Sequence, residues 1–375
     1  MLFRSRDMIA QRCQIPADHV FMQGLHQHTS IRVGTKPHLG NMGIDDDGYL
    51  SVLYRKYCDV AQMALADLKE ATLEAAEQET AEQLSFIRRY RMKDGTVRTN
   101  PGRGNPNVVG PIGQPDNTVR LLRLKRKDGP EIAIVNFSTH PDVIGGTRIS
   151  ADWPGFVRRY AEQDLPGVKC VLVNGAQGDS NHIDLADVEK KKVGYKHSAH
   201  MGRVIVDTVL DIWDKTKPCQ TGNILGQVEM KLIPTNTRGM DRVEECLELR
   251  RQIGAGLAEA PKEMGKLGEF HRICNLPRET LYQKVPVSVL GLGDVAFVGF
   301  GGEPFTQYAA AAREAGKDIY VITACLTNGG QGYLPTAEAF EEGGYEASSS
   351  SFSETVAPVL QKTAAELLER YRESR

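Results

Sequence analysis

The clearest chemical signal in this sequence is an HxH element at the predicted end of a strand. His26 and His28 follow directly after the short apolar run 20–25. Because side chains alternate along a strand, residues i and i+2 at its end can direct two imidazoles into one pocket. A lone HxH is as often a pair of hydrogen-bonded structural histidines as a metal site. Both interpretations stay open for this element alone.

Two further groups of metal-ligand type follow apolar runs that are predicted to be buried strands. His140 comes after the run 131–137, and Glu303 lies in a Gly-Gly-Glu-Pro turn after the run 295–300. Separately, His140 is readable as a structural loop histidine and Glu303 as a helix N-cap. A carboxylate beside a buried strand is costly unless it is paired or bound to a cation. Two imidazoles and one carboxylate at strand ends are typical of catalytic zinc with a position open for water.

The elements that must position these groups are predicted from apolar periodicity and from turn residues. Strands are predicted at 20–25, 118–124, 131–137, 169–173, 222–234, 282–290, 295–300 and 319–326. Helices are predicted at 3–13, 47–75, 152–163 and 195–215, with a helical excursion at about 240–270 and a C-terminal helix beginning near Ser353. Residues 92–117 form an irregular loop, and no internal repeat is evident. This alternation predicts an α/β fold with a mixed β-sheet layered with helices.

Composition excludes several classes of partner. The chain has 375 residues, of which 41% are hydrophobic and 25% charged, which is enough for a large core. Lys and Arg total 46 against 48 Asp and Glu, and neither charge forms a long block. The sequence therefore predicts no nucleic-acid groove and no polybasic membrane patch, and it favours a small-molecule substrate. It makes no prediction of the oligomeric state.

The seven cysteines are dispersed and contain no CxxC pair. They predict free thiols and a reducing, cytoplasmic location. No apolar run is long enough for a transmembrane segment, and the first residues lack the apolar region of a signal peptide, so a soluble protein is expected. The chain opens on an amphipathic helix without a preceding strand. This beginning indicates that the native N-terminus lies further upstream.

Two other kinds of active site share residue types with this sequence. Gly178-Asp179-Ser180 matches the GDS-type serine esterases in three letters, but no histidine follows His271 to complete their C-terminal pair. A metal-dependent amidohydrolase barrel also opens with HxH and would use His197 and His200 as further ligands. Eight βα units cannot be counted along this chain, and solvated helix positions are the better interpretation of both histidines.

Five segments taken together resemble, in order, motifs of the neutral/alkaline (non-lysosomal) ceramidase catalytic domain. They are GLHQHTS, NFSTHPDVIGGTRISADWPG, VNGAQGDSN, GFGGEPFTQ and GYLPTAEAFEEGGYEASSS. Each follows a predicted strand or lies in a Gly-rich loop, and together they cover roughly residues 20–350. The resemblance implies a ceramidase-like catalytic domain, here a single domain over residues 1–375.

The resemblance also implies a zinc site and a set of substrate-polarising groups. By motif position, the zinc ligands are His26, His140, Glu303 and Tyr333, and these four side chains are expected to converge on one point. The second histidine of HxH, an arginine and a second tyrosine twelve residues after the first correspond to His28, Arg88 and Tyr345. Asp142 and Asp152 are candidates for orienting the ligands.

Three features depart from the ceramidase pattern. The family carries a GDVSPN loop, whose serine aligns with Asn181, while Ser180 falls one residue earlier, so no serine nucleophile is expected. The sequence leaves no room for the C-terminal immunoglobulin-like domain, and the N-terminal Asp-Ile-Thr-Pro-like strand is absent. The resulting prediction is a zinc-dependent hydrolase that cleaves an amide (N-acyl) bond with metal-activated water, without a prediction of which amide. The alternatives are an amidohydrolase-type metal enzyme and a non-catalytic ligand-binding homologue.

Overall fold

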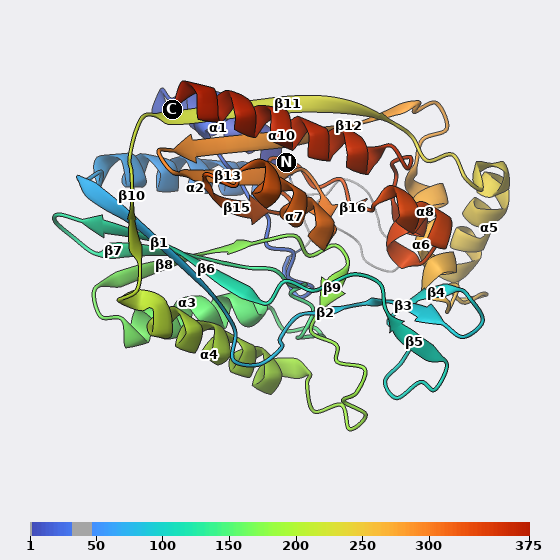
Figure 1. The fold of residues 1–375 in the computed structure, drawn as a ribbon. Coiled ribbons are helices and arrows are strands. Elements are labelled where there is room, and N and C mark those ends of the chain that lie inside the picture. The colour runs from blue at the N-terminus through green and yellow to red at the C-terminus, as the bar shows by residue number, and fades with distance from the viewer. Residues whose placement is uncertain (1, 32–46) are drawn as a thin grey trace.

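The fold has four layers, with two β-sheets stacked face to face between two layers of helices (Figure 1). The computed structural model describes residues 2–31 and 47–375. In Figure 1, α3 and α4 lie on the outer face of one sheet, and α7 and α10 lie on the outer face of the other. The mixed sheet layered with helices that the sequence predicts is thus present as two mixed sheets.

The first sheet has five strands in the order β10-β1-β6-β7-β8. Their bounds are β1 Ala71–Glu79, β6 Thr118–Arg126, β7 Glu131–Phe137, β8 Val168–Asn174 and β10 Lys217–Cys219. All neighbours are antiparallel except β7 and β8, which are parallel and are joined through the helix α3, Asp152–Asp164. The helix α4, Gly194–Trp213, packs beside α3.

The second sheet has four strands in the order β11-β12-β13-β15. Their bounds are β11 Ile224–Pro234, β12 Tyr282–Leu292, β13 Val295–Phe300 and β15 Tyr320–Ala324. Here too the one parallel pair, β13 and β15, is joined through a helix, α7, Thr306–Ala315. The C-terminal helix α10, Val356–Ser374, covers this sheet together with α7.

Apolar side chains of both sheets meet in the central layer. Leu73, Leu122, Val173 and Ile322 are buried there, although they come from four different strands. On the outer faces, separate clusters pack the first sheet against α3 and α4 and the second sheet against α7 and α10. Because the central strands are covered on both faces, they have nearly continuous apolar sequences in place of a clean alternation.

The remaining elements lie around the sandwich. They are α1 Leu2–Cys13, η1 Ala17–His19, α2 Asp47–Ala66, β2 Phe86–Ile87, β3 Arg89–Met92, β4 Val97–Thr99, β5 Val108–Pro111, β9 Ser180–Asn181, η2 Met240–Arg242, α5 Val243–Gly254, α6 Met264–Asn275, β14 Glu303–Pro304, β16 Tyr333–Leu334, α8 Ala337–Glu342 and α9 Tyr345–Ser349. No helix among the described residues is both long and apolar enough to cross a membrane.

The structure corrects three predicted elements. The helix predicted at 47–75 ends at Ala66, and the chain then enters β1. The strand predicted at 20–25 is a single β-bridge between Gln23 and Thr327. The helical excursion at 240–270 is two helices, α5 and α6, which pack on each other through a small apolar cluster.

The two sheets also repeat one arrangement, which corrects the expectation of no internal repeat. Each contains an antiparallel hairpin, a crossover helix and a parallel strand. The segments EIAIVNFSTHP (131–141) and DVAFVGFGGEP (294–304) share Ala, Val, Phe and Pro at equivalent positions. In this alignment His140 corresponds to Glu303, and each lies three residues after the end of its strand.

Candidate metal centre

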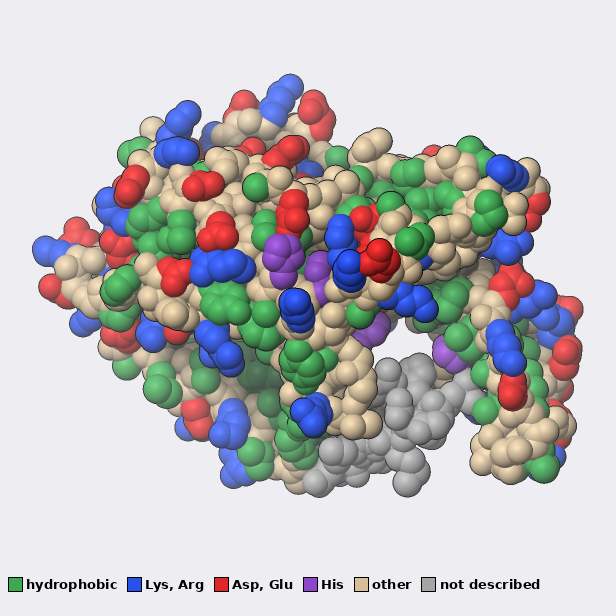
Figure 2. Space-filling view, turned by 90° about the horizontal axis from the view of Figure 1, so that it is seen from below, with side chains coloured by type: hydrophobic (Ala, Val, Ile, Leu, Met, Phe, Trp, Pro, Cys, Tyr) green, Lys and Arg blue, Asp and Glu red, His purple; other side chains and the backbone are tan. Residues whose placement is uncertain are grey.

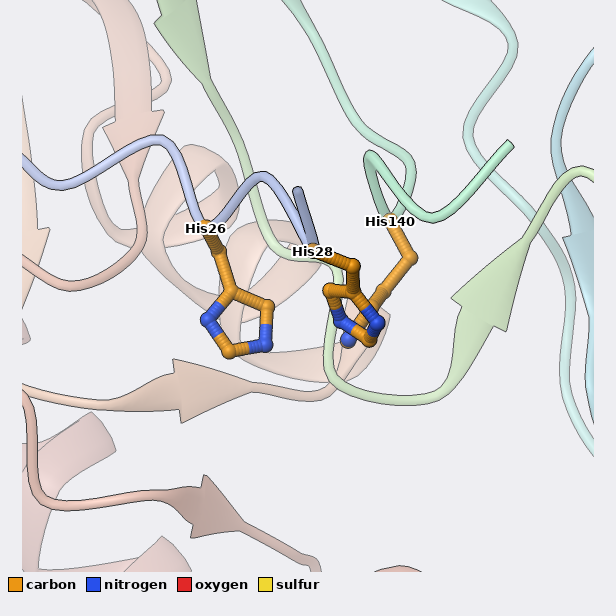
Figure 3. Close-up of side chains that lie close together, drawn as sticks. All are labelled: His26, His28 and His140. Atoms are coloured by element: carbon orange, nitrogen blue, oxygen red, sulfur yellow. The ribbon is translucent and has the colours of Figure 1, made fainter. Parts of the chain in front are cut away.

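Three loops bring His26, His28, His140 and Glu303 together. His26 and His28 come from the N-terminal segment, His140 from the loop after β7, and Glu303 from β14 directly after β13. Figure 3 shows the three imidazoles leaving two neighbouring loops and pointing into the same space. Figure 2 shows histidine side chains at separate places on one face of the molecule, among Lys, Arg, Asp and Glu side chains. The strands of two different sheets therefore deliver the site.

His26 reaches the site through an uncommon backbone conformation. Its φ of 69° lies in the left-handed region, which non-glycine residues seldom adopt. Such a conformation costs on the order of 1–3 kcal/mol and is retained where the surrounding structure fixes it. The sequence predicts that alternation along a strand directs both HxH imidazoles into one pocket. The backbone conformation at His26 sets their direction instead.

The spacing of the donor atoms fits a zinc ion. The Oε2 atom of Glu303 lies 3.4 Å from Nε2 of His26 and 3.4 Å from Nε2 of His140. Ligands bound tetrahedrally at about 2.0–2.1 Å lie roughly 3.3–3.4 Å from one another. The three histidines also place one ring nitrogen each within 4.8 Å of the others. By distance, His28 is thus a further candidate ligand.

Two of these donor atoms have no hydrogen-bond partner among the described residues. Nε2 of His140 and Oε2 of Glu303 are both buried and unsatisfied. Unpaired buried polar atoms are costly, and a metal ion is one of the few things that satisfies a nitrogen and a carboxylate oxygen together. Glu303 is also not the N-cap of α7, since the side chain that accepts from Thr306 N is that of Asp179, at 2.8 Å. The residues present therefore fit a zinc ion.

His140 is held in the tautomer that a metal requires. Its Nδ1 lies 3.1 Å from the carbonyl oxygen of Gln177, which can only accept, so Nδ1 carries the proton. Burial lowers the pKa of His140 well below its usual value, and the nearby charge of Arg88 lowers it further. A neutral imidazole with its Nε2 lone pair facing Glu303 results.

Tyr333 lies beside Glu303 because the two residues pair in the short parallel bridge of β14 and β16. Its ring stacks on that of His140, with centroids 6.3 Å apart. Burial raises the pKa of Tyr333 well above its usual value, while the Arg88 guanidinium, which hydrogen-bonds to it, acts in the opposite direction. Tyr345 meets the ring of Tyr333 edge-on at 5.7 Å.

Arg88 is almost fully buried at the junction of β2 and β3. Its Cζ lies 5.1 Å from the centroid of the Tyr333 ring, and its Nη2 donates to the carbonyl oxygen of Gly178 at 2.7 Å. Its Nε lies 2.6 Å from Oε1 of Glu346. The structure thus places Tyr333 next to His140 and Glu303, with Arg88 and Tyr345 against the Tyr333 ring.

Ser180 and Asn181, which stand at the position of the GDVSPN loop, make contacts that stabilise the fold. Ser180 and Asn181 form β9 and pair with β2. The hydroxyl of Ser180 is buried and has no hydrogen-bond partner among the described residues, so no base in that part of the chain activates it. Asn181 donates through Nδ2 to Oδ1 of Asn100 at 3.2 Å.

The two aspartates proposed to orient the ligands have different surroundings. Asp152 accepts hydrogen bonds from Ile144 N at 3.0 Å and from Ser198 Oγ at 2.7 Å, which fixes the chain between β7 and α3. Asp142 pairs with His182 instead, at 3.0 Å between Oδ1 and Nδ1. Burial opposes ionisation of Asp142, but the hydrogen bond from His182 and the nearby histidines lower its pKa overall.

The sequence does not predict that His182 and His197 are buried close to each other. His182 is buried beside Asp142, and its ring centroid lies 5.9 Å from that of His197. His197 was predicted to be solvated, but it is buried, and burial lowers its pKa to about 4. Of the two histidines of α4, only His200 is exposed, as predicted.

By class, this is a four-layer α/β protein. It carries a cluster of histidines and one carboxylate at the strand ends of its two sheets. No family model and no curated protein matches the sequence. Among solved structures, a neutral ceramidase from Pseudomonas aeruginosa matches with a TM-score of 0.66 at 14% identity, over 99% of this chain and 65% of that chain. A second, described as "Ceramidase complexed with C2", matches with a TM-score of 0.68 at 12% identity, over 100% and 66%.

These likenesses extend over essentially the whole of this chain, which spans about two thirds of the length of the ceramidases. At such low identities they establish the fold. The fold class predicted from the sequence, a ceramidase-like α/β arrangement, is confirmed.

Proposed function

We propose that this protein is a zinc-dependent hydrolase that cleaves an amide (N-acyl) bond. The observation that carries the proposal is the placement of Glu303 Oε2 at 3.4 Å from Nε2 of both His26 and His140. Two of these three atoms are buried without a hydrogen-bond partner in the described part of the chain. A carboxylate and two imidazoles around a small space are the donor set of a catalytic zinc site.

In this proposal His26, His140, Glu303 and Tyr333 hold the ion. When bound, zinc supplies a hydroxide near neutral pH and polarises a substrate carbonyl. His140 presents Nε2 because the carbonyl of Gln177 retains its Nδ1 proton. Tyr333 is kept beside Glu303 by the β14–β16 bridge and by its contact with Arg88.

The substrate carbonyl would meet His28 and Tyr345. His28 is exposed at the rim of the histidine cluster, and Tyr345 adjoins Tyr333. Donors aimed at the oxygen that gains charge each contribute roughly 2–4 kcal/mol to catalysis. Arg88 contributes its positive charge beside Tyr333, since at least two of its nitrogens already face protein oxygens.

The choice of an amide rests on the fold and the motif order together. Both matched structures are described as ceramidases, and their fold extends over the whole of this chain. The motifs that resemble the family supply the site residues described above. Ceramide itself is one member of the proposed N-acyl substrate class.

A second candidate is an amidohydrolase-type centre in which all three histidines bind metal. The observation in its favour is that His28 places a ring nitrogen within 4.8 Å of those of His26 and His140. A homologue that binds a ligand without turnover is the remaining alternative. The zinc content of a His28 variant separates the two enzyme proposals, and amide hydrolysis by the wild type separates both from the non-catalytic homologue.

The test measures zinc content and hydrolysis in the same preparation. Purified protein should contain about one zinc per chain. It should hydrolyse at least one substrate from a panel of N-acyl sphingoids, N-acyl amino acids and N-acetyl sugars, and a chelator should abolish that activity. Protein without metal, or metal-loaded protein that hydrolyses no amide, would contradict the proposal.

A further inference from the structure

Glu346 is a fully buried carboxylate beside the candidate site. It follows Tyr345 directly at the start of α9. A buried charge is retained only where opposite charges and hydrogen bonds replace its water. Glu346 must therefore be held by named partners, and those partners indicate what it does.

The two oxygens of Glu346 have separate partners. Oε1 lies 2.6 Å from Nε of Arg88. Oε2 accepts a hydrogen bond from Thr99 Oγ1 at 2.7 Å and lies 3.7 Å from Nη1 of Arg89. Two consecutive arginines thus reach the same carboxylate, one at each oxygen.

The same contacts fix the backbone at Tyr345. Thr99 Oγ1 donates to Glu346 and accepts from the backbone N–H of Tyr345 at 3.1 Å. Arg89 also donates to the carbonyl oxygen of Gly343 at 2.7 Å. The turn that carries Tyr345 is therefore attached to β3 and β4 through groups that converge on Glu346.

The directions of Arg88 and Tyr345 follow from this arrangement. The Arg88 guanidinium lies beside Tyr333, with its Nε in ion-pair contact with Glu346 and its Nη2 donating to the carbonyl of Gly178. The Tyr345 ring lies between Tyr333 and α6, where a Cβ on Gly268 would approach its Cδ2 to 3.0 Å. Arg88 thus contacts Glu346 directly, and the backbone of Tyr345 is linked to Glu346 through the Thr99 hydroxyl.

We propose that Glu346 is a positioning residue, which holds Arg88 and Tyr345 in the places where they act on the substrate. The inference rests on the proposed hydrolase function and adds to it a residue that touches neither metal nor substrate. A purely structural ion pair is the alternative. It predicts lower stability in a variant without the carboxylate, but unchanged kinetics in the molecules that remain folded.

The main test compares Glu346→Gln with Glu342→Gln. Glu342 is the matched control, because it lies at the partly exposed end of the same turn and its ion pairs among the described residues are with Arg89 at 2.9 Å and Arg91 at 3.3 Å, not with Arg88. Misplaced catalytic groups should lower kcat/KM of Glu346→Gln by about 10- to 100-fold, through kcat and with KM little changed. Glu342→Gln should stay within about twofold, and zinc per chain should equal that of the wild type in both.

A second pair of variants covers the case in which Glu346→Gln does not fold. Thr99→Val keeps the shape of the side chain but removes the hydroxyl that joins Glu346 to Tyr345 N, and Thr99→Ser restores it. The expected result is a loss of kcat in Thr99→Val and recovery in Thr99→Ser. Equal kcat in the valine and serine variants would overturn the inference.

A third experiment does not depend on turnover. It measures hydrogen exchange at the backbone amide of Tyr345. Exchange should accelerate by roughly tenfold or more in Glu346→Gln and Thr99→Val, and it should not change in Glu342→Gln. A wild type that hydrolyses no amide would contradict the proposed function, but the hydrogen-exchange experiment would still test the positioning role. Unchanged exchange, or wild-type kcat/KM in folded Glu346→Gln, would overturn the positioning role.

Discussion

His28 has two candidate roles, contact with the substrate and ligation of the metal, and they predict different zinc contents for a variant without its imidazole. It is exposed, which suits a group that meets substrate, yet its ring nitrogen is also within ligand reach of His26 and His140. If it acts on the substrate, His28→Ala should keep zinc content near the wild-type value and lower activity by roughly 10²–10³-fold. Zinc content by metal analysis and kcat/KM on the same samples distinguish the two roles.

His26→Ala serves as the reference for loss of a ligand. Its Nε2 faces Glu303 directly, so its removal should deplete zinc as well as activity. Equal depletion of zinc in the His26 and His28 variants would assign both imidazoles to the metal. The amidohydrolase-type centre would then replace the proposed division between ligand and substrate-binding histidine.

Chemical type and strand position are enough to make His140 and Glu303 candidate ligands, because each comes shortly after a buried strand in the sequence. His182 and Glu346 could not be identified in this way. The significance of His182 depends on Asp142, forty residues away, and that of Glu346 on Thr99, 247 residues away. Nothing in the local sequence marks such partners, and long-range pairing of polar groups is decided by the fold.

At the scale of the elements, the loop after β8 packs against β14 so closely that only glycine fits at position 178. A Cβ on Gly178 would lie 2.3 Å from the carbonyl oxygen of Glu303 and 2.9 Å from that of Pro304. Both are backbone atoms of the strand that carries the candidate ligand. Gly178→Ala should therefore lower the free energy of unfolding by about 1–3 kcal/mol and weaken zinc binding, as measured by denaturant titration and by competition with a chelator.

Gly330→Ala is the matched control for this prediction. Gly330 is itself exposed, in the loop after β15, and a Cβ there would meet nothing within 4 Å. Its free energy of unfolding should stay within about 0.5 kcal/mol of the wild type. If Gly178→Ala matches this control in stability and zinc affinity, the close approach of the two loops does not fix Glu303.

The N-terminus of α7 gives a pH-dependent prediction. Burial raises the pKa of Asp179 to about 6, although hydrogen bonds from Thr306 N and Oγ1 act in the opposite direction. Because the folded pKa lies above the unfolded value of 3.8, the stabilising contribution is full below about pH 3.8 and is lost as pH rises through 6. Asp179→Asn keeps an acceptor for Thr306 and cannot ionise.

The stability of Asp179→Asn relative to the wild type should therefore increase with pH. Between pH 5 and pH 7.5 the gain should be about 1–2 kcal/mol in the free energy of unfolding. Urea titrations of both proteins at the two pH values measure it, and the comparison cancels every other titrating group. A difference that is constant with pH would show that Asp179 ionises normally.

The segment 71–79 shows why some elements could not be predicted. Its sequence ATLEAAEQE has three Ala and three Glu, with one Leu and one Gln, and all of these favour helix. It nevertheless forms β1, which pairs over its full length with β6, while Leu73 and Ala75 enter the layer between the sheets. Tertiary pairing and burial outweigh a helix propensity of a few tenths of a kcal/mol per residue. The apolar strands β7, β8 and β13 carried no such conflict and were predicted.

At the scale of the whole molecule, the candidate ligands connect the two sheets. His140 follows β7 of the first sheet and Glu303 follows β13 of the second, at equivalent places in the repeated arrangement. Across the layer between them the sheets meet through apolar side chains. An ion held by both residues would therefore act as a cross-link between the halves as well as a catalytic group.

This cross-link predicts a zinc-dependent stability. An ion that binds only the folded state at about a thousand times its dissociation constant stabilises by about 4 kcal/mol. Thermal unfolding of chelator-treated protein should shift upward when zinc is restored, and the shift should be lost in His140→Ala and in Glu303→Ala. His200→Ala is the control, because His200 is exposed on α4 and pairs with Glu82, so its shift should equal that of the wild type. A zinc-induced shift that survives both ligand variants would mean that zinc binds elsewhere, and the connection between the sheets would then rest on their apolar contact alone.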